Sequence, residues 1–253
     1  MGMSRRVWMG AALGSIVVPA RSASVTGLIA SAKTSVCAVG TFSALDSPRF
    51  GFRGSGFFVG DGSKVATCWH VLPEASGDTR PGRLAVQLTA ADGTLEVREA
   101  ELASSHRQHD LAVLKVKGPP VRPLPVSRAS PIEGTEFVLV GFPIGGVLGF
   151  RQVSHRGMIA SIVASSLPTA TSRQLTEGAV ARLREGSFEM LQLDATAYPG
   201  NSGGPLLDAM TGEVLGVVNM VLLKGQRESA LSHPSGISYA VPARYLVDLL
   251  SRA

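Results

Sequence analysis

The sequence predicts an all-β protein built from two lobes of similar size. Short runs in which apolar residues alternate with polar or small ones recur along most of the chain, separated by polar turns. The first half contains no long run with helical periodicity, so the alternation of strands and helices that a parallel sheet needs is missing. Proline concentrates at residues 118–123, where it favours an extended linker. Each lobe is therefore expected to be a barrel or a sandwich.

Length and composition are those of a globular protein. The 253 residues are 45% hydrophobic and 17% charged, which is enough to bury a large core. The formal net charge of +5 is scattered, and no run of Lys and Arg follows a path that could track phosphates. Nucleic acid is therefore not an expected partner.

The N-terminus has the layout of a signal peptide, which we assign to residues 1–23. Arg5 and Arg6 precede an apolar run, Val7–Val18, that is too short for an ordinary transmembrane helix. Cleavage is expected after Ala20 or after Ala23. The arginine pair fits both a general and a twin-arginine export signal. We expect an exported protein, periplasmic or secreted, with no membrane span once the signal is removed.

The cysteine count excludes a cysteine-rich scaffold. Only Cys37 and Cys68 are present, and both lie in apolar, strand-like runs. Export permits a disulfide between them, but a buried free thiol is equally compatible with such a run. Two cysteines without a His/Cys cluster make a zinc site unexpected, and the sequence points to no cofactor.

The first lobe is assigned to about residues 31–117. Its predicted strands are bounded by turn residues such as Gly60-Asp61-Gly62. They are Ser31–Phe42, Phe50–Val59, Lys64–Val71, Leu84–Leu88, Leu95–Leu102 and Leu111–Val116.

A linker of about residues 118–130 leads to the second lobe, about residues 131–241. The predicted strands there are Glu136–Phe142, Val153–Val163, Phe188–Thr196, Pro205–Leu207, Glu213–Val221 and Ile237–Val241. An insertion, Leu167–Gly186, is expected to form a surface helix or a loop. Pro242 opens a last helix, residues 242–252, whose apolar side carries Tyr245, Leu246, Leu249 and Leu250.

The segment Gly200–Pro205 places one serine, Ser202, among glycines between two predicted strands. A serine hydroxyl is a weak nucleophile unless a base removes its proton, and an oxyanion needs closely approaching backbone donors. Glycine on both sides permits that approach. The segment is thus either a nucleophile turn or an ordinary glycine-rich hairpin.

A base and an acid are available upstream. His70 stands where a predicted strand ends, so its side chain could emerge at the edge of the first lobe. Asp110 stands directly before the apolar strand Leu111–Val116. Taken singly, His70 is interpreted as an ordinary surface histidine or a hydrogen-bonded core histidine, and Asp110 as a turn residue. Together with Ser202 they supply the three groups of a nucleophile, base and orienter system.

Three blocks resemble the catalytic blocks of trypsin-like serine proteases, and most closely those of the bacterial HtrA/Deg type. They are Thr67–Val71, His109–Val116 and Gly200–Leu206, in the order His, Asp, Ser. Supporting blocks are Gly54–Val59, Gly141–Gly145, Gln192–Ala195 and Gly236–Pro242, so the resemblance runs over nearly the whole chain after the signal.

The resemblance implies two six-stranded antiparallel β-barrels, a C-terminal helix and an active site between the barrels. Ser202 would attack the scissile carbonyl, His70 would act as the base, and Asp110 would orient the imidazole. Backbone N–H groups of Gly200, Asn201 and Ser202 would form the oxyanion hole. The implied function is a serine endopeptidase acting on exported or misfolded polypeptides, as a monomer or a homo-oligomer.

The resemblance also indicates where this chain departs from its pattern. Asn201 is neutral and cannot pair with a newly cut N-terminus, so activation by such a cleavage is not expected. The printed chain ends at Ala253, soon after the last predicted helix, and no PDZ domain is expected. The primary pocket would be lined by Thr196, Ala197, Pro199, Asn219 and Met220. None of these is acidic, which disfavours cleavage after Arg or Lys.

Two other functions fit parts of the pattern. The first is an esterase of the α/β-hydrolase fold, in which an acid and then a histidine follow the nucleophilic serine. In this chain only Asp208 and His233 follow Ser202 in that order, and they lie in a short β-rich tail. The second is an inactive or gated binding protein on the double-barrel fold, since a fold does not fix a function.

Overall fold

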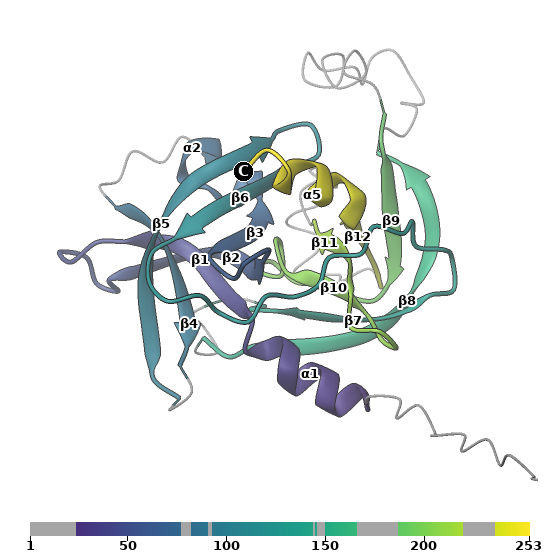
Figure 1. The fold of residues 1–253 in the computed structure, drawn as a ribbon, viewed down its shortest axis with the longest axis horizontal. Coiled ribbons are helices and arrows are strands. Elements are labelled where there is room, and N and C mark those ends of the chain that lie inside the picture. Colours follow the sequence, from purple (N-terminus) through teal and green to yellow (C-terminus); the bar gives the residue numbers. More distant parts are fainter. Residues whose placement is uncertain are drawn as a thin grey trace, which may run out of the picture.

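The computed structural model describes residues 24–76, 82–90, 93–143, 145, 150–165, 187–219 and 236–253. In these residues, antiparallel strands form two closed barrels of six strands each (Figure 1). The predicted all-β double barrel is confirmed. Residues 1–23, the 167–186 insertion and Met220 lie outside the described residues.

The first barrel closes in the strand order β1-β2-β3-β6-β5-β4. Its strands are β1 (Val36–Phe42), β2 (Phe50–Val59), β3 (Lys64–Cys68), β4 (Arg83–Thr89), β5 (Leu95–His106) and β6 (Leu111–Val116). Apolar side chains on both faces of its strands are fully buried, such as Phe57 on one face and Val65 and Leu114 on the other. Successive side chains of a strand point to opposite faces, so the consecutive buried residues of β3 and β6 show that these strands are covered on both faces.

The second barrel closes in the order β10-β11-β12-β9-β8-β7. Its strands are β7 (Glu136–Gly141), β8 (Val153–Ala164), β9 (Glu189–Asp194), β10 (Pro205–Asp208), β11 (Val214–Val218) and β12 (Ile237–Pro242). The segment between the barrels is bonded to both of them: Leu124 N donates to Phe58 O at 2.8 Å, and Val214 N donates to Pro125 O at 2.8 Å.

The start of the first lobe differs from the prediction. Residues 31–33 were expected to begin a strand, but they end helix α1 (Val25–Lys33), and the strand begins only at Val36. The Ser24 hydroxyl caps this helix by accepting a bond from Gly27 N at 3.1 Å. The prediction was wrong because it joined the polar segment Lys33–Ser35, which separates the helix from the apolar run of β1, to the strand.

The third strand is also shorter than predicted. It ends at Cys68, and Trp69–Val71 form a single 3₁₀ turn followed by a short helix, α2 (Pro73–Ser76). The prediction of strand up to Val71 was therefore wrong. This turn matters for the site because it takes His70 out of the strand's alternation and leaves it half-buried.

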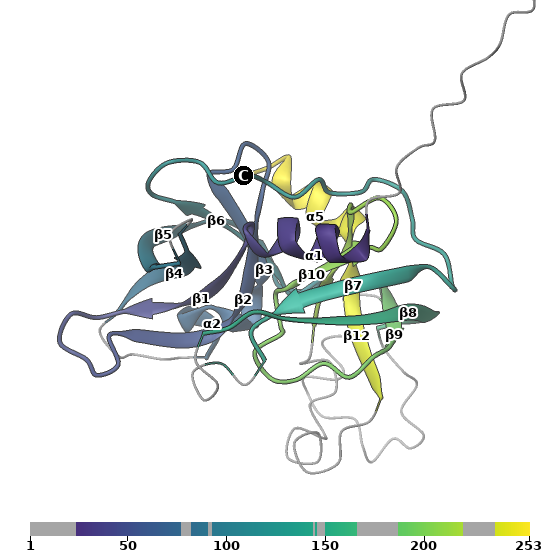
Figure 2. The ribbon, with the colours of Figure 1, turned by 90° about the horizontal axis from the view of Figure 1, so that it is seen from below.

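Helix α5 (Ala243–Leu250) follows the last strand, and the predicted C-terminal helix is confirmed. Leu246 and Leu249 are buried, while Tyr245 and Leu250 are half-buried. The helix packs on β11 and β12 of its own barrel and on β5 and β6 of the other (Figures 1 and 2). It thereby joins the two barrels. No helix among the described residues is long and apolar enough to span a membrane.

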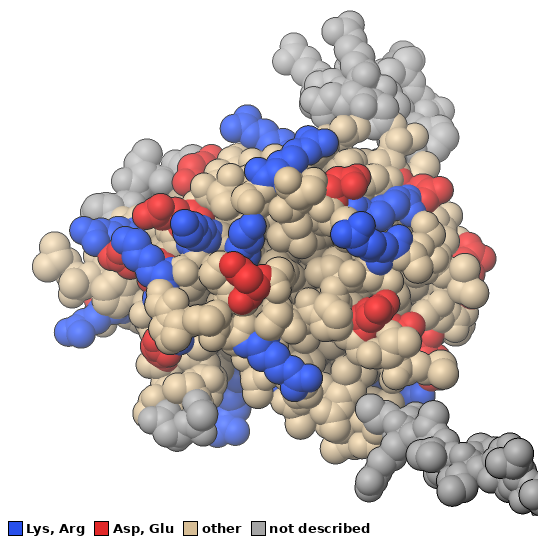
Figure 3. All heavy atoms as spheres, viewed as in Figure 1, with Lys and Arg blue, Asp and Glu red and all other residues tan. Residues whose placement is uncertain are grey.

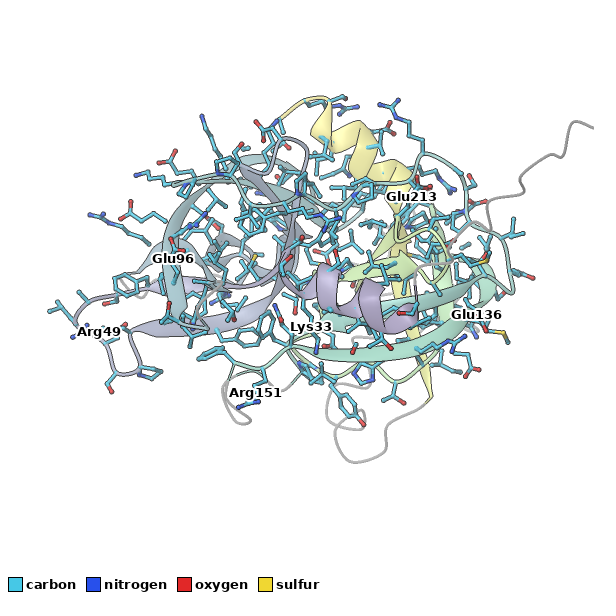
Figure 4. All side chains as sticks on the ribbon, turned by 60° about the horizontal axis from the view of Figure 1, so that its bottom comes forward. Lys33, Arg49, Glu96, Glu136, Arg151 and Glu213 are labelled. Atoms are coloured by element: carbon cyan, nitrogen blue, oxygen red, sulfur yellow. The ribbon has the colours of Figure 1, made fainter. Side chains whose placement is uncertain are left out.

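Charged side chains lie on the outside of the barrels. Figure 3 shows both signs interspersed over the face drawn, without a large area of one sign. Glu96 and Glu136, labelled in Figure 4, lie on the outer surface of the molecule. Ion pairs such as Arg156–Glu136 (2.7 Å) are exposed and contribute little to stability.

Candidate active site

His70 and Asp110 form a directly bonded pair at the edge of the first barrel. His70 Nδ1 lies 2.5 Å from Asp110 Oδ2, and the backbone N of His70 donates to Asp110 Oδ1 at 2.8 Å. The two side chains are 20% and 13% exposed. The carboxylate therefore holds both the ring and the main chain of His70. A proton on Nδ1, bonded to the carboxylate, leaves Nε2 as the atom that can accept another proton.

Asp110 occupies a backbone conformation that L-residues rarely adopt. Its φ of +54° is the one positive value at a non-glycine position among the described residues. Aspartate tolerates this left-handed region better than most side chains. Asp110 N donates to Arg107 O, and Asp110 O accepts from Trp69 N, both at 3.1 Å. The tight turn after β5 thus aims the carboxylate at the end of β3.

Asn219 adds a third bond to the same carboxylate. Its Nδ2 donates to Asp110 Oδ2 at 2.8 Å, and its side chain is buried. Asn219 follows β11, so this bond crosses from the second barrel to the first. The sequence suggested Asn219 for the substrate pocket, and the structure shows its Nδ2 bonded to Asp110.

Ser202 lies in a turn whose shape depends on glycine. Gly200 has a φ of +101° and Gly203 a φ of +85°. A Cβ on Gly203 would lie 2.1 Å from Ser55 O and 2.5 Å from Thr67 Oγ1, so no larger residue fits there. Gly203 N donates to Val218 O at 2.9 Å. The serine turn is therefore pressed against β2 and β3 of the first barrel, and Ser202 is 5% exposed.

Ser55 joins the serine turn to the first barrel. Its hydroxyl donates to Gly200 O at 2.6 Å and accepts from Phe142 N at 3.0 Å. Its backbone N donates to Ser202 O at 2.8 Å. Nothing in the sequence identified this role, although Ser55 stands in the resembling block Gly54–Val59. Its position between two glycines was the signal that could have indicated a close backbone approach.

Asn201 is fully buried, and neither of its side-chain amide atoms has a hydrogen-bond partner within the described part of the chain. A buried amide without hydrogen bonds loses its bonds to water and gains none in the protein, so its burial costs free energy. Its backbone N–H donates to Tyr198 O at 3.0 Å. Of the three N–H groups named from the sequence as oxyanion donors, that of Asn201 is therefore engaged within the turn.

The remaining residues that the sequence assigned to the primary pocket differ in solvent exposure. Ala197 is buried, Thr196 is half-buried, and Pro199 is exposed. The segment Thr196–Pro199 leads into the serine turn and contains no acid.

Cys68 lies beside the His70–Asp110 pair. Its thiol donates to Val218 O at 3.3 Å, and burial, followed by the charge of Asp110, raises the pKa of this thiol. Cys68, His70 and Asp110 are the one group of possible metal ligands within reach of each other in the described ranges. The His and Asp atoms are already bonded to each other, so the arrangement suits proton transfer better than ion binding. Cys37 and Cys68 are both buried free thiols, so they form no disulfide.

The fold consists of two closed barrels. One barrel carries a histidine–aspartate pair, and the other brings a glycine-held serine to their junction. These features define the double-barrel serine peptidase class. A sequence model of the trypsin-like peptidase domain matches residues 54–217. This chain belongs to that family.

Relatives of the chain carry HtrA, Deg and Do-like names. It is 29% identical over 213 residues to protease Do-like 1, chloroplastic, of Arabidopsis thaliana, covering 82% of this chain and 39% of that protein. It is 28% identical over 201 residues to a probable periplasmic DegP-like serine endoprotease of Hahella chejuensis, covering 79% and 35%. The chain thus spans less than two fifths of the length of these relatives.

The fold recurs in solved structures. The serine endoprotease from Yersinia pestis superposes with a TM-score of 0.59 at 23% identity, over 90% of this chain and 65% of that one. At this identity the likeness concerns the fold.

Proposed function

We propose that the protein is a serine endopeptidase in which Ser202 is the nucleophile, His70 the general base and Asp110 the residue that orients His70. The observation that carries the proposal is the His70–Asp110 pair, with Nδ1 and Oδ2 2.5 Å apart and Asn219 bonded to the same carboxylate. An imidazole held in this way has one tautomer and one orientation, which a base must have before substrate arrives.

In the proposed reaction, Ser202 Oγ attacks the carbonyl carbon of the scissile peptide while His70 Nε2 takes the hydroxyl proton. The tetrahedral intermediate collapses as His70 returns that proton to the leaving amine, and an acyl ester on Ser202 remains. Water, deprotonated by His70, then attacks the ester and releases the new carboxyl end. Asp110 stays ionised throughout and stabilises the charged imidazole.

The backbone N–H groups of Gly200 and Ser202 are the proposed oxyanion donors, since that of Asn201 is bonded to Tyr198. Removing one such donor typically costs about 3 to 4 kcal/mol of transition-state stabilisation. The φ of +101° at Gly200 and the bond from Ser55 to Gly200 O orient the peptide groups of this turn.

The proposed substrates are polypeptides, cut after uncharged residues of small to medium size. Thr196, Ala197 and Pro199 offer no carboxylate to a basic side chain. A peptide-library digest tests this, and dominant cutting after Arg or Lys would refute it.

Residues 1–23 are the proposed export signal. The proposed location is the periplasm or the medium, where the peptidase would act on exported or misfolded proteins. The support is the basic and apolar layout of that segment. N-terminal sequencing of exported material should begin near Arg21 or Ser24, and a retained segment in a cytosolic product would contradict it.

A fluorophosphonate probe tests the nucleophile directly, because it labels only an activated serine. The unmodified protein should be labelled, and the folded variants Ser202→Ala and His70→Ala should not. Labelling that persists in Ser202→Ala would place the reactive group elsewhere. No labelling of folded, unmodified protein would favour a binding protein on the same fold.

A further inference from the structure

Two histidines are stacked on the turn that precedes Asp110. The rings of His106 and His109 lie 4.0 Å apart at an interplanar angle of 9°, and His109 N donates to His106 Nδ1 at 3.3 Å. Imidazole lone pairs lie in the ring plane, so two parallel stacked rings cannot direct them at one ion. The pair is therefore a packing unit and not a metal site.

The other face of His109 meets the second barrel. Its ring centroid lies 4.0 Å from that of Tyr245 on α5 and 4.8 Å from that of Phe188, which precedes β9. Tyr245 is itself fixed, because its hydroxyl accepts from Glu189 N at 3.3 Å and from Arg244 Nη2 at 3.2 Å. His109 is thus inserted between a histidine of the first barrel and two aromatic rings of the second.

His109 behaves as an uncharged aromatic ring at neutral pH. Burial, and after it the neighbouring His106, lower the pKa of His109 to about 4. An uncharged ring packs against aromatic neighbours without the desolvation cost of a charge.

The residue after His109 is Asp110, whose positive φ must be maintained by its surroundings. A non-glycine residue in this region costs on the order of 1 to 3 kcal/mol and persists only where neighbouring contacts determine it. On the near side, the Arg107 guanidinium lies over the Trp69 ring at 4.9 Å, and Trp69 adjoins His70. On the far side, the His109 ring contacts Tyr245 and so ties the turn to α5.

We propose that His109 is a positioning residue for Asp110: its ring, held between His106 and Tyr245, fixes the turn that aims the carboxylate at His70. Through this contact the C-terminal helix of the second barrel supports an acid supplied by the first. The inference rests on the proposed function, in which Asp110 orients the base.

The test compares His109→Ala, which removes the ring, with His109→Phe, which keeps an uncharged ring of similar size. His109→Ala should lower kcat about tenfold to a hundredfold with little change in KM, because a displacement near 1 Å can cost that much. The downfield proton resonance of the His70 Nδ1–H bonded to Asp110 should broaden or disappear. His109→Phe should restore both. Tyr245→Leu, which removes the ring on the helix side, should reproduce the His109→Ala result if that variant is too unstable to assay.

Val163→Ala serves as a control, since Val163 is a partly buried core side chain of β8. It should lower the unfolding temperature without changing kcat or the His70 resonance. Unchanged kcat and resonance in both His109→Ala and Tyr245→Leu would overturn the positioning role. Equal losses in His109→Ala and His109→Phe would do the same, since the ring would not be what matters. Probe labelling of the unmodified protein separates these outcomes from a failure of the proposed function.

Discussion

The two halves of the candidate site are held in place by different means. The half on the first barrel is organised by side chains: the Asp110 carboxylate receives the ring and main chain of His70 and the amide of Asn219. The half on the second barrel is organised by backbone: Gly200 and Gly203 have positive φ, and the turn around Ser202 is bonded mainly through its peptide groups. The first half should be sensitive to changes of functional group, and the second to changes of volume.

The largest expected effect tests the side-chain half. Asp110→Asn should lower kcat roughly ten-thousandfold, because an amide presents a donor where His70 Nδ1–H needs an acceptor and favours the wrong tautomer. Steady-state peptide hydrolysis measures this. Asp208→Asn is the matched control, since the Asp208 carboxylate accepts turn bonds from Met210 N and Thr211 N, away from His70. A large loss of activity in the control would instead favour the esterase arrangement, in which Asp208 is the acid.

The next effect tests the backbone half. Gly203→Ala should destabilise the fold by at least about 3 kcal/mol, because its Cβ would overlap Ser55 O in addition to straining φ. Gly134→Ala is the control: Gly134 has a φ of +83°, but a Cβ there meets nothing within 4 Å. It should cost only the strain of about 1 to 2 kcal/mol. Equal values in urea unfolding would show that volume is not what restricts the serine turn.

A smaller effect sharpens the boundary between the halves. Asn219→Ala removes one bond to Asp110, and a hydrogen bond to a charged group contributes about 1.5 to 3 kcal/mol. The kcat should therefore fall roughly tenfold to a hundredfold, with KM nearly constant. If KM rises instead while kcat is unchanged, Asn219 acts in the substrate pocket, as its sequence position suggested.

The smallest effect concerns pH and the turn before Asp110. The pKa of His109 is lowered to about 4, below its unfolded value of about 6.5. The unfolded chain therefore binds a proton first, and the free energy of unfolding falls as pH drops from about 6.5 towards 4. Besides His106, the charged groups facing His109 are Arg244 and Asp248 on α5, where Asp248 opposes the shift.

His109→Phe should flatten this dependence of stability on pH. Urea unfolding at about pH 5 and about pH 7.5 would measure it. Some slope should remain, because burial also lowers the pKa of His155 in the second barrel. An unchanged slope in His109→Phe would assign the pH dependence to other groups.

Most of the barrel strands were predictable because they are short runs rich in apolar residues and bounded by turn residues, and several, such as β6 and β11, are buried on both faces. Helix α1 was not, since the polar segment Lys33–Ser35 that separates it from β1 was assigned to the strand. The 3₁₀ turn at Trp69–Val71 was hidden because it continues the largely apolar composition of β3.

The candidate catalytic residues were predictable from short blocks, because each block carries a chemical group in a local context. The residues that support them were not. Asn219 meets Asp110 across 109 positions of sequence, and Ser55 meets Gly200 across 145. Nothing local to either residue specifies such a partner; only the closure of the two barrels against each other does.

The position of α5 has a consequence for the order in which the molecule matures. The segments that carry His70 and Asp110 leave the ribosome early, whereas Tyr245, which packs on the His109 ring, follows every strand of both barrels. During synthesis the turn of Asp110 therefore lacks one of its supports until the second barrel has been made. Under the proposed function, a nascent chain would carry His70, Asp110 and Ser202 before it could use them efficiently, and proteolysis would begin only when folding is nearly complete.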